Sequence, residues 1–245
     1  MTTLTKIPAA NIGKAEGKIA AHADTPARAG TRATTLRINE IFFSLQGESS
    51  RVGLPTVFVR LTGCPLRCGY CDTAYAFHDG KTRLIDDVID EVRQHKTNYV
   101  CVTGGEPLAQ KNCLTLLKKL CDLDYAVSLE TSGAINIVDV DPRVSRIVDI
   151  KTPGSGEVDK NRWENLAHLT RFDEIKFVIT SEADYRWAAL LIEEKKLNDR
   201  APVLFSPSFN DVRVEHLAAW ILRDRLNVRM QIQLHKIIWG EKRGV

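Results

Sequence analysis

From Leu36 onward, the hydrophobic positions of the chain alternate between two kinds of pattern. Short, nearly continuous apolar runs, as expected of strands covered on both faces, are followed by stretches with a helical period. The expected strands span residues 56–61, 99–103, 126–130, 146–150, 175–179, 203–205 and 229–234. This alternation predicts an α/β protein built from successive βα units around a parallel sheet.

The expected helices follow these strands. Residues 84–94 carry one apolar stripe, formed by Leu84, Ile85, Val88, Ile89 and Val92, and residues 114–123 form a second helix. Ser181 and Asp184 predict the cap of a helix over residues 183–195. A further apolar face is formed by Val214, Leu217, Ala218, Ile221 and Leu222. The count of units favours an incomplete (βα) barrel with its site at the carboxyl ends of the strands.

The first 34 residues differ from the rest. They are rich in Ala, Thr and Gly, contain no aromatic residue and show no sustained apolar period, so they are expected to form a flexible tail. An organellar targeting peptide is an alternative interpretation, because acidic residues are few, but no amphipathic Arg-rich helix supports it. Residues 35–245 are expected to form one catalytic domain.

Charge and composition narrow the function classes. The formal net charge is +3, and residues 1–34 account for it with five basic and two acidic residues. The remaining body is formally neutral, which argues against a large nucleic-acid surface. No run approaches the roughly 18 apolar residues of a membrane span, and no signal-peptide core is present at the start. We therefore expect a soluble, cytoplasmic protein without nucleic-acid or membrane partners.

The chain has six cysteines, which are expected to stay reduced in the cytosol. Cys101, Cys113 and Cys121 fall in apolar strand or helix patterns, where a small buried hydrophobe is the simpler interpretation. The other three are clustered, so a metal or catalytic role is expected for them.

The clustered cysteines, Cys64, Cys68 and Cys71, have the spacing C-x3-C-x2-C directly after an expected strand. A four-iron cluster usually takes one thiolate per iron, so three ligands leave one iron open to chelate a substrate. The alternative is zinc, which prefers four closed ligands. No second cysteine pair is present, although His78 could complete a Cys3His set.

The spacing, with Tyr70 before the last cysteine, resembles the radical S-adenosylmethionine (SAM) superfamily. The resemblance implies that the open iron binds SAM and that Tyr70 lies against adenine, with simple packing as the alternative. Residues 103–107, Thr-Gly-Gly-Glu-Pro, are similar to the superfamily motif that holds the methionyl amine, which assigns this role to Gly105 and Glu106.

Further cofactor contacts are expected where other strands end, because a barrel places its ligand there. A helix cap or a solvated strand end is the alternative for each residue. The candidates are Glu130, Ser132, Asp149, Ile150, Lys151, Lys176, Phe177, Val178 and Ile179.

A narrower resemblance rests on residues 39–48 (NEIFFSLQGE), 57–60, 71–73, the TGGEP motif and 233–236. Together they resemble the 7-carboxy-7-deazaguanine synthase family of queuosine biosynthesis, over nearly the whole expected domain. The resemblance implies a carbon–nitrogen lyase that converts 6-carboxy-5,6,7,8-tetrahydropterin to 7-carboxy-7-deazaguanine with loss of ammonia. One departure is Asp-Ile-Lys at 149–151, where many relatives carry Ser-Pro-Lys.

The same resemblance assigns substrate contacts. The pterin edge suits Leu45, Gln46, Gly47 and Glu48, and its carboxylate suits the guanidinium of Arg60, which could otherwise be a sheet-end charge. Thr103 is expected to touch the substrate, and His235 to reach it from the last strand unless that histidine is structural. Thr73 would ligate Mg2+, although the sequence alone indicates only a turn residue there.

The implied cofactors are a [4Fe-4S] cluster, SAM and Mg2+, and the implied partners are a reducing protein such as flavodoxin or ferredoxin and a second copy in a homodimer. Two rival functions remain open. A glycyl-radical-enzyme activase shares the cysteine loop but acts on a protein, and a non-catalytic iron–sulfur or zinc protein has no need of the TGGEP turn.

Overall fold

The structure is a computed structural model that describes residues 34–209 and 211–245. The tail expected over residues 1–34 lies outside this range, except for Thr34. None of the helices in the described range is long and apolar enough to cross a membrane.

The described residues form one nine-stranded sheet with the order β3-β1-β2-β4-β5-β6-β7-β8-β9. Strand β1 pairs antiparallel with β2 and β3, and the remaining neighbours pair in parallel. The sheet ends at β3 and β9 and does not close, which confirms the incomplete barrel. The strands are β1 (Thr35–Leu45), β2 (Pro55–Leu61), β3 (Lys81–Leu84), β4 (Tyr99–Gly104), β5 (Ala126–Thr131), β6 (Ser145–Asp149), β7 (Glu174–Ile179), β8 (Val203–Pro207) and β9 (Arg229–Met230).

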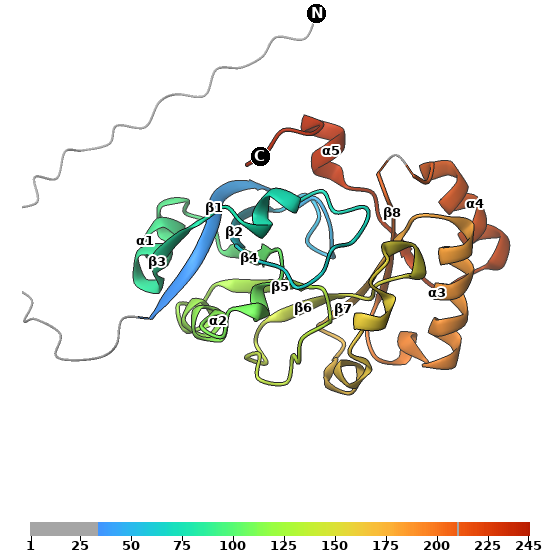
Figure 1. Cartoon of the computed structure of the whole chain (residues 1–245), viewed down its shortest axis with the longest axis horizontal. Coiled ribbons are helices and arrows are strands. Elements are labelled where there is room, and N and C mark those ends of the chain that lie inside the picture. The colour runs from blue at the N-terminus through green and yellow to red at the C-terminus, as the bar shows by residue number, and fades with distance from the viewer. Residues whose placement is uncertain (1–33, 210) are drawn as a thin grey trace, which may run out of the picture. The chain divides into compact units, whose positions relative to one another are not determined.

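Four helices of the described range flank the sheet, and a fifth, next to the C-terminus, lies above the strands in the view of Figure 1. They are α1 (Ile85–Gln94), α2 (Cys113–Asp122), α3 (Glu182–Glu194), α4 (Val214–Asp224) and α5 (Leu234–Trp239). The first four confirm expected helices, and the Ser181 hydroxyl accepts from the Asp184 amide at 3.2 Å, as a cap should. Leu84 departs from its expected stripe because it ends β3 with an exposed side chain.

Two expectations about the strands were incomplete. The antiparallel strands β1 and β3 were not predicted, because their polar and charged residues interrupt the apolar pattern. Residues 229–234 were expected to form one strand, but only Arg229–Met230 do. The Gln231 backbone amide still donates to the Phe205 carbonyl of β8 at 2.9 Å, and its side-chain amide hydrogen-bonds the backbone of Ser49 at 2.7 and 2.8 Å. Leu234 then begins α5.

The core has two clusters of buried apolar side chains. One joins β1, β2, β4 and β5 to α1 and α2, and the other joins β7 and β8 to α3 and α4. Between β5 and β6 there is no helix, and short 3-10 turns, including η5 (Trp163–His168), connect β6 to β7. The βα alternation is therefore interrupted in the middle of the sheet, on the stretch that connects the two clusters.

Candidate active site

A cavity of about 630 Å³ opens at the carboxyl ends of the parallel strands. Its lining brings together residues from β1, β2 and β4–β8, the cysteine loop and α5. Most residues singled out from the sequence line it: Leu45, Gln46, Gly47, Glu48, Arg60, Cys64, Cys68, Tyr70, Cys71, Thr73, Thr103, Gly105, Glu130, Ser132, Asp149, Lys151, Lys176, Val178 and His235. The position agrees with the general rule for barrels of this kind.

Four expected cofactor residues do not line this cavity. They are Glu106, Ile150, Phe177 and Ile179. The last three have side chains buried in the apolar cluster under α3 and α4, where they pack instead of facing a ligand. Contacts through their backbones remain a prediction.

Glu106 is fully buried and its carboxylate is occupied by the protein itself. It accepts from the Thr131 hydroxyl at 2.9 Å, from the Ser132 amide at 2.7 Å and from the Leu108 amide at 2.9 Å. Because Thr131 and Ser132 line the cavity, Glu106 fixes the end of β5 from behind. A direct contact from Glu106 to the methionyl amine stays a prediction.

The cysteine loop follows β2, and all three thiols are partly exposed and free. Burial raises the pKa of Cys68 to about 11, so a bound cation is needed to hold it as the thiolate at neutral pH. The TGGEP turn lies directly behind the loop, because a Cβ on Gly105 would stand 2.3 Å from the Gly63 carbonyl oxygen and 2.8 Å from Cys64 Cβ. Only glycine permits that approach.

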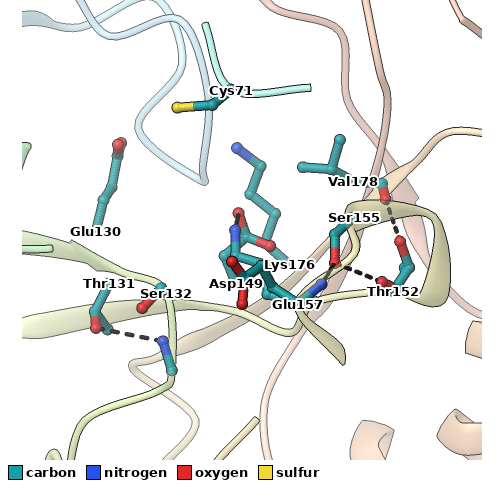
Figure 2. Close-up of polar contacts among 12 residues, drawn as sticks. Cys71, Glu130, Thr131, Ser132, Asp149, Thr152, Ser155, Glu157, Lys176 and Val178 are labelled. Carbon is teal, nitrogen blue, oxygen red and sulfur yellow. Dashed lines mark hydrogen bonds and ion pairs between the residues drawn. The ribbon is translucent and has the colours of Figure 1, made fainter. Parts of the chain in front are cut away.

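A turn after β6 holds the other side of the loop. The Gly69 amide donates to the Ser155 carbonyl at 3.1 Å, and Ser155 belongs to η3 (Pro153–Ser155). Figure 2 shows how this turn is fixed: Ser155 donates to the Thr152 carbonyl at 2.6 Å, and Thr152 donates to the Val178 carbonyl at 3.2 Å. The loop is thereby tied to β6 and β7.

His78, the possible fourth zinc ligand, is exposed and lies outside the cavity lining. Within the described ranges, no three His, Cys, Asp or Glu side chains converge closely enough to hold a single metal ion.

Several buried polar atoms of the cavity wall have no hydrogen-bond partner among the described residues. They are the Tyr70 hydroxyl, one oxygen each of Glu48 and Asp149, and the Ser206 hydroxyl. Buried polar groups are normally satisfied, so unpaired ones on a cavity wall indicate a polar ligand. Burial also raises the pKa of Tyr70, which keeps its hydroxyl protonated.

Two lysines carry charge into the site. Lys151 pairs with Asp149 at 2.8 Å, and Lys176 pairs with Glu48. Although burial opposes ionisation, Lys176 lowers the pKa of Glu48. Figure 2 places Cys71 on one side and Asp149 with Lys176 on the other, so both signs of charge lie opposite the Cys71 thiol.

Glu130 lies at the end of β5 among substrate candidates. It accepts from the Thr103 hydroxyl at 3.0 Å and from the Gln46 amide at 3.4 Å. Burial and the nearby Glu48 carboxylate raise the pKa of Glu130. The expected cofactor residue Glu130 therefore contacts two expected substrate residues, and its position supports a substrate contact equally well.

His235 was expected on a strand and instead lies in the first turn of α5. The helix is anchored by the Leu234 amide, which donates to the Gly47 carbonyl at 3.1 Å. A Cβ on Gly47 would meet His235 Nδ1 at 2.1 Å, so the glycine allows the imidazole to pack directly on the β1 end. Burial lowers the pKa of His235 and favours the neutral ring.

Thr73 Oγ1 lies 3.8 Å from Cys71 Sγ, its only polar contact within the described ranges. The hydroxyl oxygen is therefore available to a cation. Because Mg2+ keeps waters and takes ligands from substrates, one protein oxygen suits it when the substrate supplies others.

Sequence reasoning missed part of the cavity wall. Among the missed residues are Phe42, Phe58, Tyr75, Ser206, Phe209, Lys236 and residues 240–245. Phe42 and Phe58 stack with ring centroids 4.8 Å apart, a pairing that requires the β1–β2 register. Phe42, Phe58 and Lys236 had a usable signal, since they belong to segments 39–48, 57–60 and 233–236, on which the family resemblance rests.

Comparison with known proteins agrees with this geometry. A family model described as the Radical SAM superfamily matches residues 58–146. The chain is 47% identical to the 7-carboxy-7-deazaguanine synthase of Chlorobaculum tepidum, over 86% of this chain and 97% of that protein. It is 42% identical to the synthase of Koribacter versatilis, over 86% of this chain and all of that protein.

The fold also matches a solved structure. The crystal structure of QueE from Escherichia coli superimposes with a TM-score of 0.69 at 22% identity, covering 82% of this chain and 95% of that one. This likeness concerns the fold, whereas the sequence identities to the two synthases concern the family. The chain belongs to the 7-carboxy-7-deazaguanine synthase family, within the radical SAM superfamily.

Proposed function

We propose that this protein is a 7-carboxy-7-deazaguanine synthase, a carbon–nitrogen lyase that contracts the ring of 6-carboxy-5,6,7,8-tetrahydropterin with loss of ammonia in queuosine biosynthesis. One observation carries the proposal: the three thiols and the expected pterin contacts Gln46 and Arg60 line one cavity. Family membership supports the same activity.

The residues present fit the cofactors of the family. The free thiols of Cys64, Cys68 and Cys71 would hold a [4Fe-4S] cluster with one open iron. The unpaired Tyr70 hydroxyl and the unpaired oxygen of Asp149 are suited to the adenosyl and methionyl parts of SAM. When bound, the cluster and SAM would supply the radical chemistry that abstracts hydrogen from the substrate.

The chain's own residues bind and orient the substrate. Arg60 is placed to pair with the pterin carboxylate, and Gln46, Thr103 and Glu130 form a connected polar wall for the ring amide. His235, neutral at physiological pH, closes the wall from α5. Thr73 would ligate Mg2+ beside the carboxylate. The protein contributes orientation and exclusion of water around a reactive radical.

Several assignments belong to the same proposal. Residues 35–245 act as the catalytic domain, in the cytoplasm, as a homodimer. The electron comes from a small reducing protein such as flavodoxin or ferredoxin. Gly105 and Glu106 hold the methionyl amine, with Ser132, Lys151 and Val178 as further cofactor contacts.

The experiment is anaerobic cluster reconstitution, followed by incubation with SAM, Mg2+, a strong reductant and the carboxytetrahydropterin. We expect 7-carboxy-7-deazaguanine, identified by mass and ultraviolet absorption. Cluster-loaded protein that leaves the pterin unchanged would refute the assignment.

The same cluster-loaded preparation distinguishes the synthase from two rival functions. An activase gives no role to Arg60, so an Arg60→Ala variant that works as well as wild type favours the activase. A non-catalytic iron–sulfur protein forms no 5′-deoxyadenosine under strong reductant. Iron content alone does not distinguish the rivals, because all of them bind the metal.

A further inference from the structure

A cross-strand pair lies behind the cavity wall. Glu40 of β1 and Arg60 of β2 are register partners, and the register shifts between Ile38 and Glu40. The shift is a local bulge, and bulges re-aim side chains near functional sites. Glu40 lies outside the cavity lining, whereas Arg60 is part of it.

Glu40 engages only one edge of the Arg60 guanidinium. Arg60 Nε donates to Glu40 Oε1 at 2.7 Å, and the Tyr75 hydroxyl donates to the same oxygen at 2.8 Å. Within residues 34–209 and 211–245, neither Nη nitrogen of Arg60 has a hydrogen-bond partner. The two Nη groups form the fork that binds carboxylates in bidentate fashion.

Two aromatic rings flank the same guanidinium. The Arg60 carbon Cζ lies 5.6 Å from the centre of the Phe42 ring and 5.9 Å from that of Tyr75. Phe42 is itself held by its stack on Phe58. The guanidinium is therefore fixed by one carboxylate and two rings before any ligand arrives, which reduces the ordering cost of binding.

We propose that Glu40 is a positioning residue that presents the free fork of Arg60 to the cavity and thereby selects a pterin bearing a carboxylate. This inference rests on the proposed function and goes further by naming what fixes the selectivity. Tyr75 is the second anchor, and it belongs to η1 (Ala74–Phe77), directly after the cysteine loop.

Charge balance and positioning predict opposite effects of removing Glu40 on the affinity for an anion. Glu40 carries a negative charge next to Arg60, so removing that charge alone should strengthen the binding of an anion. Removing the contact that positions Arg60 should instead weaken anion binding. Glu40→Gln removes the charge and keeps an acceptor oxygen, whereas Glu40→Ala removes both.

The test measures binding of 6-carboxypterin, and of pterin without the carboxylate, to cluster-loaded protein with SAM by fluorescence titration. For Glu40→Ala we expect the Kd of 6-carboxypterin to rise about 10-fold, the equivalent of about 1.4 kcal/mol. Glu40→Gln should stay within about threefold of wild type or bind more tightly, because the acceptor is retained. Pterin without the carboxylate should bind all three proteins equally.

Turnover gives the second readout: Glu40→Ala should raise KM for the carboxytetrahydropterin far more than it lowers kcat, with iron content unchanged. The matched control is Glu91→Ala, which breaks the Arg83–Glu91 pair of 2.6 Å between β3 and α1, outside the cavity lining. It should leave both Kd values unchanged.

Three results would overturn the inference. Glu40→Ala could bind 6-carboxypterin as tightly as wild type or more tightly, which means that Glu40 only balances charge. Glu40→Ala could lose affinity for both pterins equally, which means a general disturbance of the cavity wall. Wild type could show no preference for the carboxylated pterin. The first two results leave product formation by wild type, and with it the proposed function, intact.

Discussion

Strand β6 carries a buried or half-buried charge near each end, and the two are treated differently. At the amino end, Arg146 donates to both oxygens of Asp173, at 2.9 and 2.6 Å, and to the His168 carbonyl at 2.8 Å. At the carboxyl end, Asp149 pairs with Lys151 through one oxygen and leaves the other buried without a partner.

This difference separates stability from function along a single strand. The Arg146–Asp173 pair is satisfied by the protein, as a structural ion pair must be when it is buried. The Asp149 end is left incomplete on a cavity wall, together with Tyr70 and Ser206. Incomplete polar groups of this kind cost stability unless a ligand satisfies them.

The largest effect should come from the cavity at the carboxyl ends of the strands, where the cysteine loop lies. Cys68→Ala removes one ligand of the proposed cluster, so we expect product formation to be abolished and bound iron to fall, because cluster ligation needs all three thiolates. Iron analysis and the visible absorption of the reconstituted protein measure this. Cys121→Ala, in a buried position of α2, is the control and should retain iron.

Alanine substitutions of the two carboxylates, Asp173 and Asp149, test the comparison directly. Asp173→Ala leaves Arg146 buried without its partner and should lower the free energy of unfolding by about 3–5 kcal/mol. Asp149→Ala should lower it by less, even though Lys151 is left buried, because the Asp149 carboxylate is partly exposed and has fewer protein partners to lose. It should also reduce SAM binding. Chemical denaturation and a SAM titration measure the two quantities. Equal stability losses would contradict the comparison.

The Arg146–Asp173 pair should also make the stability of the protein depend on pH. Burial alone would raise the pKa of Asp173, but the hydrogen bonds from Arg146 and the Thr170 amide lower it. The stabilisation is therefore complete above the unfolded-state pKa of about 3.9 and is lost as the pH falls through the lower native pKa. The stability gap between wild type and Asp173→Asn should shrink below about pH 4, as followed by urea unfolding. A gap that stays constant down to pH 2 would disprove this assignment.

The smallest effect concerns Ser206, which is buried with an unpaired hydroxyl. Ser206→Ala removes a polar atom that no protein group satisfies, so stability should stay the same or rise by up to about 1 kcal/mol. Affinity for SAM or for the pterin should fall. Thermal unfolding without ligands, compared with ligand titration, measures both. A clear loss of stability would mean that the hydroxyl has a structural partner.

Much of the fold could be predicted, because a buried parallel strand such as β4 is a nearly continuous apolar run. The antiparallel strand β1 could not, since its charged residues Arg37 and Glu40 are explained only by tertiary contacts. The early end of β9 was also missed, because α5 is anchored by the bond from the Leu234 amide to the Gly47 carbonyl, which joins positions distant in sequence.

The candidate site was predictable where a motif carried the chemistry, as in the cysteine loop and the TGGEP turn. It was not predictable where the chemistry depends on register or on local packing. Glu106 belongs to a motif, yet its carboxylate already accepts hydrogen bonds from Thr131 and Ser132. Tyr75 had no sequence signal, and its place beside Arg60 appears only when β1, β2 and η1 are brought together.

The central claim is that the open end of the barrel binds SAM and a carboxylated pterin for ring contraction. The most direct measurement supplies cluster-loaded protein with limiting SAM and excess 6-carboxy-5,6,7,8-tetrahydropterin and counts 7-carboxy-7-deazaguanine formed per SAM added. We expect SAM to be regenerated after each turnover, so the product should exceed the SAM supplied. Consumption of SAM without any deazaguanine product would contradict the claim.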